Sequence, residues 1–346
     1  MSTSAPPPYG GSVARAPSVS TLEWAMVFRL FTLWLACVSF GCVNLDGFVY
    51  NPIHCSEVGP STCEQVDEPW DRFCVPCDQD YQWDAIYPWM PETLAVDQSV
   101  RPIAPSAVSR HELQTTDGQG VLDVYELKGH GERIEVADTT IVYNHGNKGG
   151  IEHYLHRVRL LYEAGFNVVV WDYRGYGKSS EGTATGQQLL ADARQVAQWS
   201  RKRALNPQKV IIYGYSLGAV PATHMAEHSQ PCALLLEAPW TSLERIALRN
   251  AALSVPDGFL STGSFDNLER ATRIKTPTLV MSGQDDTVFP AQDIELLYGA
   301  FAGPKELWIL PGVRHGVADG GVPLAGFDAY IGRVLSFIQA QAPQCL

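Results

Sequence analysis

A serine between two glycines carries the most specific chemistry in this sequence. Ser216 lies at the centre of G-Y-S-L-G, residues 214–218, directly after the apolar run 210–213. Where such a motif joins a buried strand to a helix, the serine occupies a strained turn and its hydroxyl projects from the sheet. The start of the helix then offers the backbone N–H of Leu217 to a developing negative charge. The motif predicts a nucleophilic serine, and a tight turn without chemistry is the alternative.

The sequence also contains a base and an acid for this serine. A nucleophilic serine needs a base to take its proton, and the base needs an acid to orient it. His315 follows one apolar run near the C-terminus, and Asp285 and Asp286 follow the run before it. Glu237, which ends another apolar run, is a further candidate for the acid. These residues predict a triad of Ser216, His315 and one of the carboxylates.

Short apolar runs alternate with helical patterns from about residue 103 onward. Each run is continuous and bounded by Gly, Pro, Asn or Asp, which is typical of strands covered by helices on both faces. Two segments before them, 110–116 and 121–128, have the pattern of antiparallel edge strands. The predicted buried strands are residues 140–143, 168–171, 210–213, 233–236, 278–281 and 307–310.

Between these runs, apolar residues spaced three and four apart predict helices. Parallel strands joined through helices form right-handed crossovers. We therefore expect an α/β fold over residues 101–346, an open and mostly parallel eight-stranded sheet flanked by helices. Sites in such sheets form beyond the carboxyl ends of the strands, where the candidate triad residues occur. The predicted helices are residues 152–164, 187–203, 217–227, 291–301 and 324–339.

Four motifs resemble those of the α/β-hydrolase superfamily. The resemblance covers residues 105–340 and is greatest to monoglyceride-lipase-like and serine-aminopeptidase-like proteins. In that family the acid falls three residues after a glycine, which here selects Asp286 over Asp285. The motifs are H-G-N at 145–147, D-Y-R-G-Y-G-K-S at 172–179, G-Y-S-L-G at 214–218, and G-x-x-D-x-V at 283–288 together with His315.

The resemblance implies a serine hydrolase that cleaves carboxylic ester or thioester bonds of a small acyl substrate through an acyl-enzyme. It implies an oxyanion hole formed by the backbone N–H groups of Leu217 and Asn147, with His145 shaping the loop. An exopeptidase or amidase with the same triad is one alternative, and a non-catalytic surface binding module of the same fold is another. Metalloprotease, P-loop and dinucleotide motifs do not occur in the sequence, so we expect neither a metal nor a nucleotide cofactor.

Composition narrows the class of protein further. The chain of 346 residues is 45% hydrophobic, which argues against wholesale disorder. Its net charge is −12, and its densest basic block is only the three residues 201–203. A nucleic-acid-binding protein would present a basic face, so nucleic acid is not an expected partner.

The first 42 residues have the pattern of a disordered leader followed by an export signal. Residues 30–40 are mostly apolar and follow Arg29, but a membrane-spanning helix needs about 20 apolar residues. Met26 is an alternative start, and Cys42, preceded by glycine, resembles a lipidated cysteine. We expect an exported protein, periplasmic or on the cell surface, with membrane attachment through Cys42 as one form. A buried or membrane-anchoring helix is the alternative.

A cysteine-rich extension, residues 43–100, has no counterpart in the common fold. Its four cysteines lie among Trp, Pro and Asp residues, and so short a segment can bury little apolar surface. Two disulfides are expected here, with zinc bound by four thiolates as the alternative. Cys232 and Cys345 either pair or remain as buried thiols. The four cysteines of the extension are Cys55, Cys63, Cys74 and Cys77.

A small cap is expected over residues 240–274, after the strand that ends near Glu237. Residues 241–253 have a helical pattern and 255–262 that of a loop, which together are too short to cover a deep acyl tunnel. Four aromatic residues can supply an apolar rim to the site, although each is as well explained by ordinary packing. They are Trp240, Phe259, Phe265 and Phe289.

Overall fold

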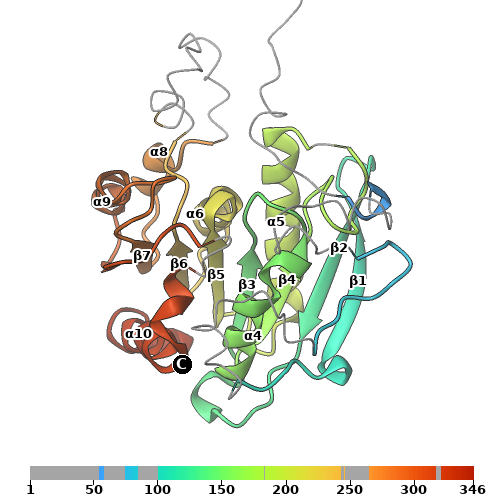
Figure 1. The fold of residues 1–346 in the computed structure, drawn as a ribbon, viewed down its shortest axis with the longest axis horizontal. Helices are drawn as coiled ribbons and strands as arrows, with labels where there is room; N and C mark the ends of the chain where they lie inside the picture. The colour runs from blue at the N-terminus through green and yellow to red at the C-terminus, as the bar shows by residue number, and fades with distance from the viewer. Residues whose placement is uncertain are drawn as a thin grey trace, which may run out of the picture. The chain divides into compact units, whose positions relative to one another are not determined.

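Eight strands form one sheet in the order β1-β2-β4-β3-β5-β6-β7-β8 (Figure 1). β1 pairs antiparallel with β2, and β2 pairs antiparallel with β4. Every later pairing is parallel, so the predicted mostly parallel eight-stranded sheet is confirmed. The strands are β1 Val108–Gln114, β2 Val121–Leu127, β3 Thr140–Asn144, β4 Asn167–Trp171, β5 Val210–Tyr215, β6 Ala233–Glu237, β7 Thr278–Gly283 and β8 Lys305–Leu310.

This computed structural model describes residues 54–57, 75–84, 100–182, 184–242, 245, 265–316 and 321–346. All of them belong to one unit that begins at Leu45. The predicted leader 1–42, Cys63, Cys74 and most of the predicted cap, including Phe259, lie outside the described residues. In the described part of the chain, no helix has both the length and the apolar character needed to cross a membrane.

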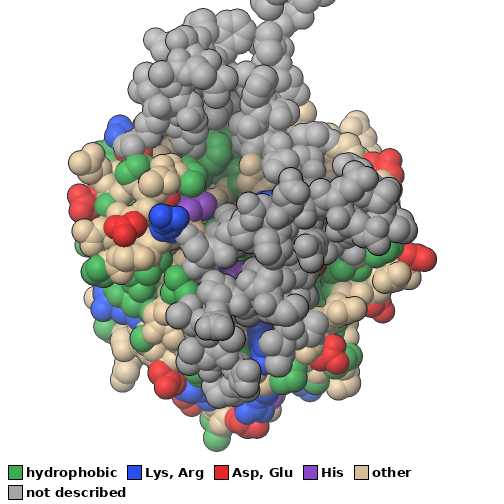
Figure 2. Space-filling model, in the orientation of Figure 1, with side chains coloured by type: hydrophobic (Ala, Val, Ile, Leu, Met, Phe, Trp, Pro, Cys, Tyr) green, Lys and Arg blue, Asp and Glu red, His purple; other side chains and the backbone are tan. Residues whose placement is uncertain are grey.

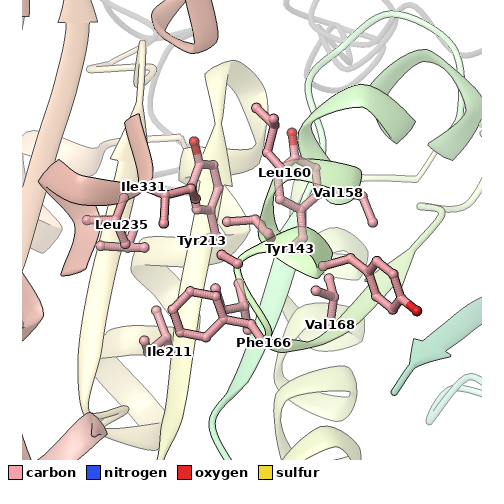
Figure 3. Packing of buried hydrophobic residues seen from close by; sticks show 14 of the residues in the cluster. Tyr143, Val158, Leu160, Phe166, Val168, Ile211, Tyr213, Leu235 and Ile331 are labelled. Atoms are coloured by element: carbon pink, nitrogen blue, oxygen red, sulfur yellow. The ribbon is translucent and has the colours of Figure 1, made fainter. Parts of the chain in front are cut away.

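Helices cover both faces of the sheet. Because successive side chains of a strand point to opposite faces, Tyr143 packs in one core cluster while Val142 packs in the other. α4 and α10 lie over the face that carries Tyr143, and Figure 3 shows Leu160 of α4 near the ring of Tyr143 and Ile331 of α10 near the ring of Tyr213. α5, α6, α8 and α9 contribute to the cluster that contains Val142. The helices are α4 Leu155–Glu163, α5 Gly186–Arg203, α6 Ala219–Ser229, α8 Asn267–Ala271, α9 Ala291–Ala300 and α10 Phe327–Gln341.

Three helix starts differ from the prediction. The helix expected from residue 152 begins as the 3₁₀ turn Ile151–Tyr154, and α4 follows it from Leu155. The helix expected from residue 217 begins as the 3₁₀ turn Ser216–Gly218, and α6 follows it from Ala219. The helix expected from residue 324 begins at Phe327, because Gly326 has a φ of 86° that a helix cannot include. By contrast, α5 begins close to the predicted position, at a capping box formed by Thr185 and Gln188.

Two disulfides occur in the described part of the chain. Cys55 bonds to Cys77 in the cysteine-rich extension, and Cys232 bonds to Cys345 across 113 residues. The second bond resolves the choice left open by the sequence, because Cys345 lies beside Cys232 at the start of β6. The first is one of the two bonds expected in the extension. Zinc bound by four thiolates of the extension is incompatible with this bond, because the sulfurs of Cys55 and Cys77 are joined to each other.

Charged side chains occupy several separate places on the face drawn in Figure 2. Acidic residues are spread along the rim of the coloured surface, with basic and hydrophobic residues between them.

Candidate active site

The turn after β5 places Ser216 in a strained backbone conformation. β5 ends at Tyr215, and Ser216 has a φ of 53°, a left-handed value that is unfavourable for a residue with a Cβ. Such strain costs on the order of 1–3 kcal/mol and persists only where the surrounding structure imposes it. The sharp strand-to-helix turn predicted from the G-Y-S-L-G motif is therefore present at the expected residue.

The two glycines of the motif allow the chain to pack closely around this turn. A Cβ on Gly214 would lie 2.5 Å from the carbonyl oxygen of Gly218. A Cβ on Gly218 would lie 2.1 Å from the carbonyl oxygen of Asn144, at the end of β3. Both positions must be glycine because backbone atoms, which cannot move aside, occupy the space a side chain would need.

His315 reaches Ser216 from the loop that follows β8. Its Nε2 lies 2.9 Å from the Oγ of Ser216, within hydrogen-bond range. The Oη of Tyr215 donates a hydrogen bond of 3.1 Å to the carbonyl oxygen of His315, which fixes the backbone of the loop. The half-buried imidazole thus has access to the serine from a residue about 100 positions away in the chain.

Asp286 holds the other side of this imidazole. Its Oδ2 lies 2.8 Å from the Nδ1 of His315, and its Oδ1 accepts hydrogen bonds of 2.8 Å from the backbone N–H groups of Val288 and Phe289. The carboxylate is 3% exposed, whereas Asp285 is exposed to solvent. The structure therefore brings together Ser216, His315 and Asp286, the combination selected by the family resemblance.

Glu237, the alternative acid, has different partners. Its carboxylate accepts hydrogen bonds from the guanidinium of Arg157, the closest at 2.8 Å, and one of 2.5 Å from the Oη of Tyr213. Arg157 in turn donates a hydrogen bond of 3.1 Å to the carbonyl oxygen of Gly316, next to His315. The alternative prediction, that Glu237 is the acid of the triad, is wrong, because the carboxylate oxygens of Glu237 bind this buried arginine.

The predicted aromatic rim is partly a wall of the site and partly core. The ring of Phe289 lies edge-on to His315, with centroids 5.1 Å apart. Trp240 lies 6.0 Å from Phe289, and its indole N–H donates to the carbonyl oxygen of Phe265. All three aromatic side chains are buried, so Phe289 confines the imidazole directly while the other two support it.

The loop after β3 is fixed by tyrosine hydroxyls. The Oη of Tyr176 donates a hydrogen bond of 2.6 Å to the Oδ1 of Asn147, and the Oη of Tyr173 donates one of 2.7 Å to the carbonyl oxygen of His145. The ring of His145 stacks on that of Tyr173 at 4.0 Å, and its Nδ1 contacts the carbonyl oxygen of Gly146. Burial lowers the pKa of His145 to about 4, so this imidazole is neutral near pH 7.

Sequence reasoning missed Arg157 and Tyr176 as contributors to the site. Tyr176 belongs to the recognised motif at 172–179, so its place beside Asn147 was foreseeable. Arg157 gives no comparable signal, because an arginine in an amphipathic helix is usually on the surface. Here it is fully buried, and its guanidinium lies over the ring of Tyr215, 4.1 Å from the centroid.

Two groups in the described part of the chain bring three metal-ligating atoms within 4.8 Å of one another. One consists of His54, Cys55 and Cys77, whose sulfurs are joined in a disulfide. The other consists of His224, Glu227 and His228 on α6, where Glu227 is paired with Arg273 at 2.6 Å. Arg270 also approaches Glu227, at 3.7 Å, and these cations oppose the binding of a metal ion there.

Comparison with known proteins places this geometry in a family. The model of the serine aminopeptidase S33 family matches residues 135–265, which include Ser216. A C. elegans protein named alpha/beta hydrolase domain-containing protein aho-3 is 30% identical over 209 residues, 59% of this chain and 58% of its own length. The chain belongs to the α/β-hydrolase superfamily.

Two further relatives each match about half of the chain. An uncharacterized protein of Mycobacterium tuberculosis is 34% identical over 175 residues, 49% of this chain and 62% of its own length. The lysophosphatidylserine lipase ABHD12 of Danio rerio is 32% identical over 191 residues, 48% of each chain. The chain therefore spans about half to two thirds of the length of these curated relatives.

Solved structures of α/β-hydrolases share the fold. The Pyrococcus furiosus esterase Pf2001 superposes with a TM-score of 0.55 at 19% identity, covering 77% of this chain and 98% of the esterase. The ferulic acid complex of Est1E from Butyrivibrio proteoclasticus also gives 0.55 at 19% identity, covering 66% of this chain and 99% of Est1E. At these identities the comparison supports the sheet and helix arrangement, which is the predicted fold class.

Proposed function

We propose that this α/β-hydrolase cleaves carboxylic ester or thioester bonds of small acyl substrates through Ser216. The observation that carries the proposal is the continuous hydrogen-bonded chain from the Oγ of Ser216 to His315, at 2.9 Å, and from His315 to Asp286, at 2.8 Å. Packing alone gives no reason to hold these three side chains in line at the ends of three strands. A nucleophile, a base and an orienting acid require this order of contacts.

Each residue has a defined role in the proposed reaction. The Oγ of Ser216 attacks the acyl carbon while the Nε2 of His315 takes its proton. The same nitrogen then gives that proton to the departing alcohol or thiol, which leaves an acyl-enzyme. A water molecule attacks the acyl-enzyme with His315 again as the base, and this step releases the acid and restores Ser216. Asp286 keeps the imidazole in the required tautomer and stabilises its charged form.

We assign the oxyanion hole to the backbone N–H groups of Leu217 and Asn147. Leu217 follows Ser216 in the first turn before α6, where the peptide dipoles favour negative charge. Asn147 lies in the loop after β3, and its side chain is held by Tyr176. Donors fixed in advance are effective because they need no rearrangement when charge develops on the substrate oxygen.

The partner of Asp266 and the name of one relative support esters over peptides as the substrate class. An exopeptidase usually needs a carboxylate to bind the free amino group of its substrate. Of the three carboxylates considered for this role, Asp266 accepts a hydrogen bond from the N–H of Glu269 and caps α8, while Glu244 and Asp257 lie outside the described residues. The name of the Danio rerio relative, a lysophosphatidylserine lipase, also supports acyl esters.

A substrate panel tests the proposed function. Purified protein is assayed with p-nitrophenyl esters of increasing acyl length and with aminoacyl-anilides, next to Ser216→Ala and the matched variant Ser200→Ala. Ser200 is a buried serine in α5, remote from the site. Hydrolysis of esters that is lost only in Ser216→Ala supports the proposal. Preferential hydrolysis of anilides supports the exopeptidase, and no turnover of either class supports the binding module.

We further propose that the protein is exported and that Cys42 is a site of membrane attachment. Disulfides form and persist in oxidising compartments, and both Cys55–Cys77 and Cys232–Cys345 are bonded. The N-terminal residue of the mature protein, determined by mass spectrometry, tests this proposal. A lipid-modified Cys42 at the N-terminus is the expected result, and an intact leader on protein from the cytosol would contradict it.

A further inference from the structure

The cysteine-rich extension contacts the loop between β4 and α5. We use the name brace for residues 54–56 and 75–84, which the Cys55–Cys77 disulfide joins, and tyrosine loop for residues 172–180. The backbone N–H of Cys55 donates a hydrogen bond of 2.8 Å to the carbonyl oxygen of Gly177, and the Nε2 of His54 lies 2.7 Å from the carbonyl oxygen of Ser179. One end of the brace is thus attached to the backbone of the tyrosine loop.

The other end of the brace reaches a buried carboxylate. The Oη of Tyr81 donates a hydrogen bond of 2.8 Å to the Oδ2 of Asp172, and the ammonium of Lys178 lies over the ring of Tyr81, 4.5 Å from its centroid. Tyr81 is itself buried, packed against Tyr125 of β2. A Cβ at Gly177 would lie 2.7 Å from this hydroxyl, so the tyrosine loop packs directly on Tyr81.

Asp172 connects the brace to the loop assigned to the oxyanion hole. While its Oδ2 faces Tyr81, its Oδ1 accepts a hydrogen bond of 2.9 Å from the backbone N–H of Ile151. Ile151 comes directly after residues 145–150, which include Asn147 and which we call the oxyanion loop. A single carboxylate therefore joins the brace to the far end of the oxyanion loop.

The tyrosine loop holds the near end of the same oxyanion loop. Tyr173 binds the carbonyl oxygen of His145, and Tyr176 binds the side chain of Asn147. In the path from the brace to Asn147, each contact between separate segments is a direct hydrogen bond, and the backbone of the tyrosine loop connects these contacts. A shift of the tyrosine loop by a fraction of an ångström would move the backbone N–H of Asn147 relative to the substrate oxygen, and oxyanion stabilisation depends on that distance.

We propose that the brace is a positioning element for the oxyanion hole, with Tyr81 as its positioning residue and the Cys55–Cys77 disulfide as the bond that keeps it in place. The inference rests on the proposed ester hydrolysis. It assigns to the extension a role in the rate of the chemical step. The binding of substrate in its ground state should not depend on the extension. Cys77 is exposed, so a reductant can reach this bond.

A conservative variant tests the positioning residue. Tyr81→Phe keeps the ring packing and removes the hydrogen bond to Asp172, while Tyr162→Phe, a buried tyrosine of α4, is the matched control. We expect kcat to fall on the order of tenfold in Tyr81→Phe, less than the roughly 10²-fold for losing an oxyanion donor outright. KM should be unchanged, because the lost interaction acts on the transition state alone. Affinity for a boronic acid or trifluoromethyl ketone inhibitor should fall in parallel.

The two disulfides offer a second, matched comparison. The double variant Cys55→Ser/Cys77→Ser releases the brace, whereas Cys232→Ser/Cys345→Ser releases a bond at the amino ends of the strands, away from Ser216. We expect the first to lower kcat and the second to leave kcat unchanged while both remain folded by circular dichroism. Equal kcat in wild type, Tyr81→Phe and the first double variant would overturn the proposal.

Hydrogen exchange separates this inference from the proposed function. If the wild type hydrolyses no ester, the proposed function fails, but exchange measured by mass spectrometry still reports on the brace. Release of the Cys55–Cys77 bond should speed exchange in peptides that cover residues 145–154 and 172–180, and leave peptides of β7 and β8 unchanged. Unaltered protection of residues 145–154 in the first double variant would show that the brace does not hold this loop.

Discussion

The guanidinium of Arg157 and the carboxylate of Glu237 form a fully buried ion pair, 2.8 Å apart, beneath the loop that carries His315. Arg157 also binds the carbonyl oxygen of Gly316. Burial opposes the positive charge of Arg157, but Glu237 together with Tyr215 and Tyr143 outweighs burial, and the pKa of the guanidinium lies well above its ordinary value. The pair links α4 and β6 to the backbone next to the proposed base.

Glu237→Gln should destabilise the protein strongly, because it removes the carboxylate charge that compensates the buried charge of Arg157. Breaking one side of a buried pair typically costs about 3–5 kcal/mol of unfolding free energy. Urea denaturation followed by circular dichroism measures this loss. The exposed ion pair of Arg101 and Glu132 supplies the control, since Glu132→Gln should leave the denaturation midpoint almost unchanged. Equal midpoints for the two variants would contradict the importance given to the buried pair.

Asp286→Asn should lower kcat by orders of magnitude, while Asp285→Asn should have little effect. In an established serine protease, replacing the aspartate that orients the histidine costs on the order of 10⁴ in kcat, because the imidazole is left in the wrong tautomer. Asp285 is exposed, and Asp286 is the carboxylate bonded to His315. Steady-state hydrolysis of an ester by the two adjacent variants decides between them. A greater loss in Asp285→Asn would make the assignment of the acid wrong.

Stability should fall as the pH is lowered from 6.5 toward 4, partly because of His145. Its folded pKa of about 4 lies below the ordinary value of 6.5, so the unfolded chain binds a proton in this range that the folded chain does not. The contribution to stability is therefore complete above pH 6.5 and decreases as the pH falls toward 4. One such proton changes the free energy of unfolding by about 1.4 kcal/mol per pH unit.

The variant His145→Asn tests this contribution. Asparagine does not titrate, and its side-chain N–H can still donate to the carbonyl oxygen of Gly146. Unfolding free energies from urea denaturation at pH 6.5, 5.5 and 4.5 should depend less steeply on pH in the variant than in the wild type. Identical slopes would show that His145 does not remain neutral in the folded protein.

The Cys232–Cys345 disulfide should contribute more to stability, whereas the Cys55–Cys77 disulfide should contribute more to activity. In the chain-entropy estimate, closing a loop of 22 residues stabilises by about 3 kcal/mol and one of 113 residues by about 5 kcal/mol. Removing Cys232–Cys345 should therefore lower the melting temperature more than removing Cys55–Cys77. Calorimetry of the two double variants provides the measurement. A larger drop in melting temperature on removing Cys55–Cys77 would mean that the extension contributes more to stability than the length of its closed loop implies.

The sheet was predictable because its strands are buried on both faces. Continuous apolar runs such as 210–213 leave few alternatives, and the site residues follow from the rule that sites form at the carboxyl ends of parallel strands. Ser216 and His315 lie where that rule puts them, and the geometry favours Asp286 over Asp285. The choice between these two adjacent aspartates as the acid required the family resemblance, because both lie in the same turn.

Long-range polar contacts were not predictable from the sequence. Arg157 has the spacing of a residue on an amphipathic helix, and only the tertiary structure puts Glu237 beside it. The pairing of Cys232 with Cys345 depends on the C-terminal helix returning to the start of β6. Tyr81 belongs to a segment without periodicity, so its contact with Asp172 has no local signal.

Covalent labelling tests most directly whether Ser216 is the nucleophile. A fluorophosphonate reacts with a serine that a neighbouring histidine activates, and the adduct can be assigned to a peptide by mass spectrometry. We expect one adduct, on the peptide that contains Ser216, which is absent in Ser216→Ala and retained in Ser200→Ala. Labelling at another residue, or no labelling of the folded wild type, would contradict the assignment of Ser216 as the nucleophile.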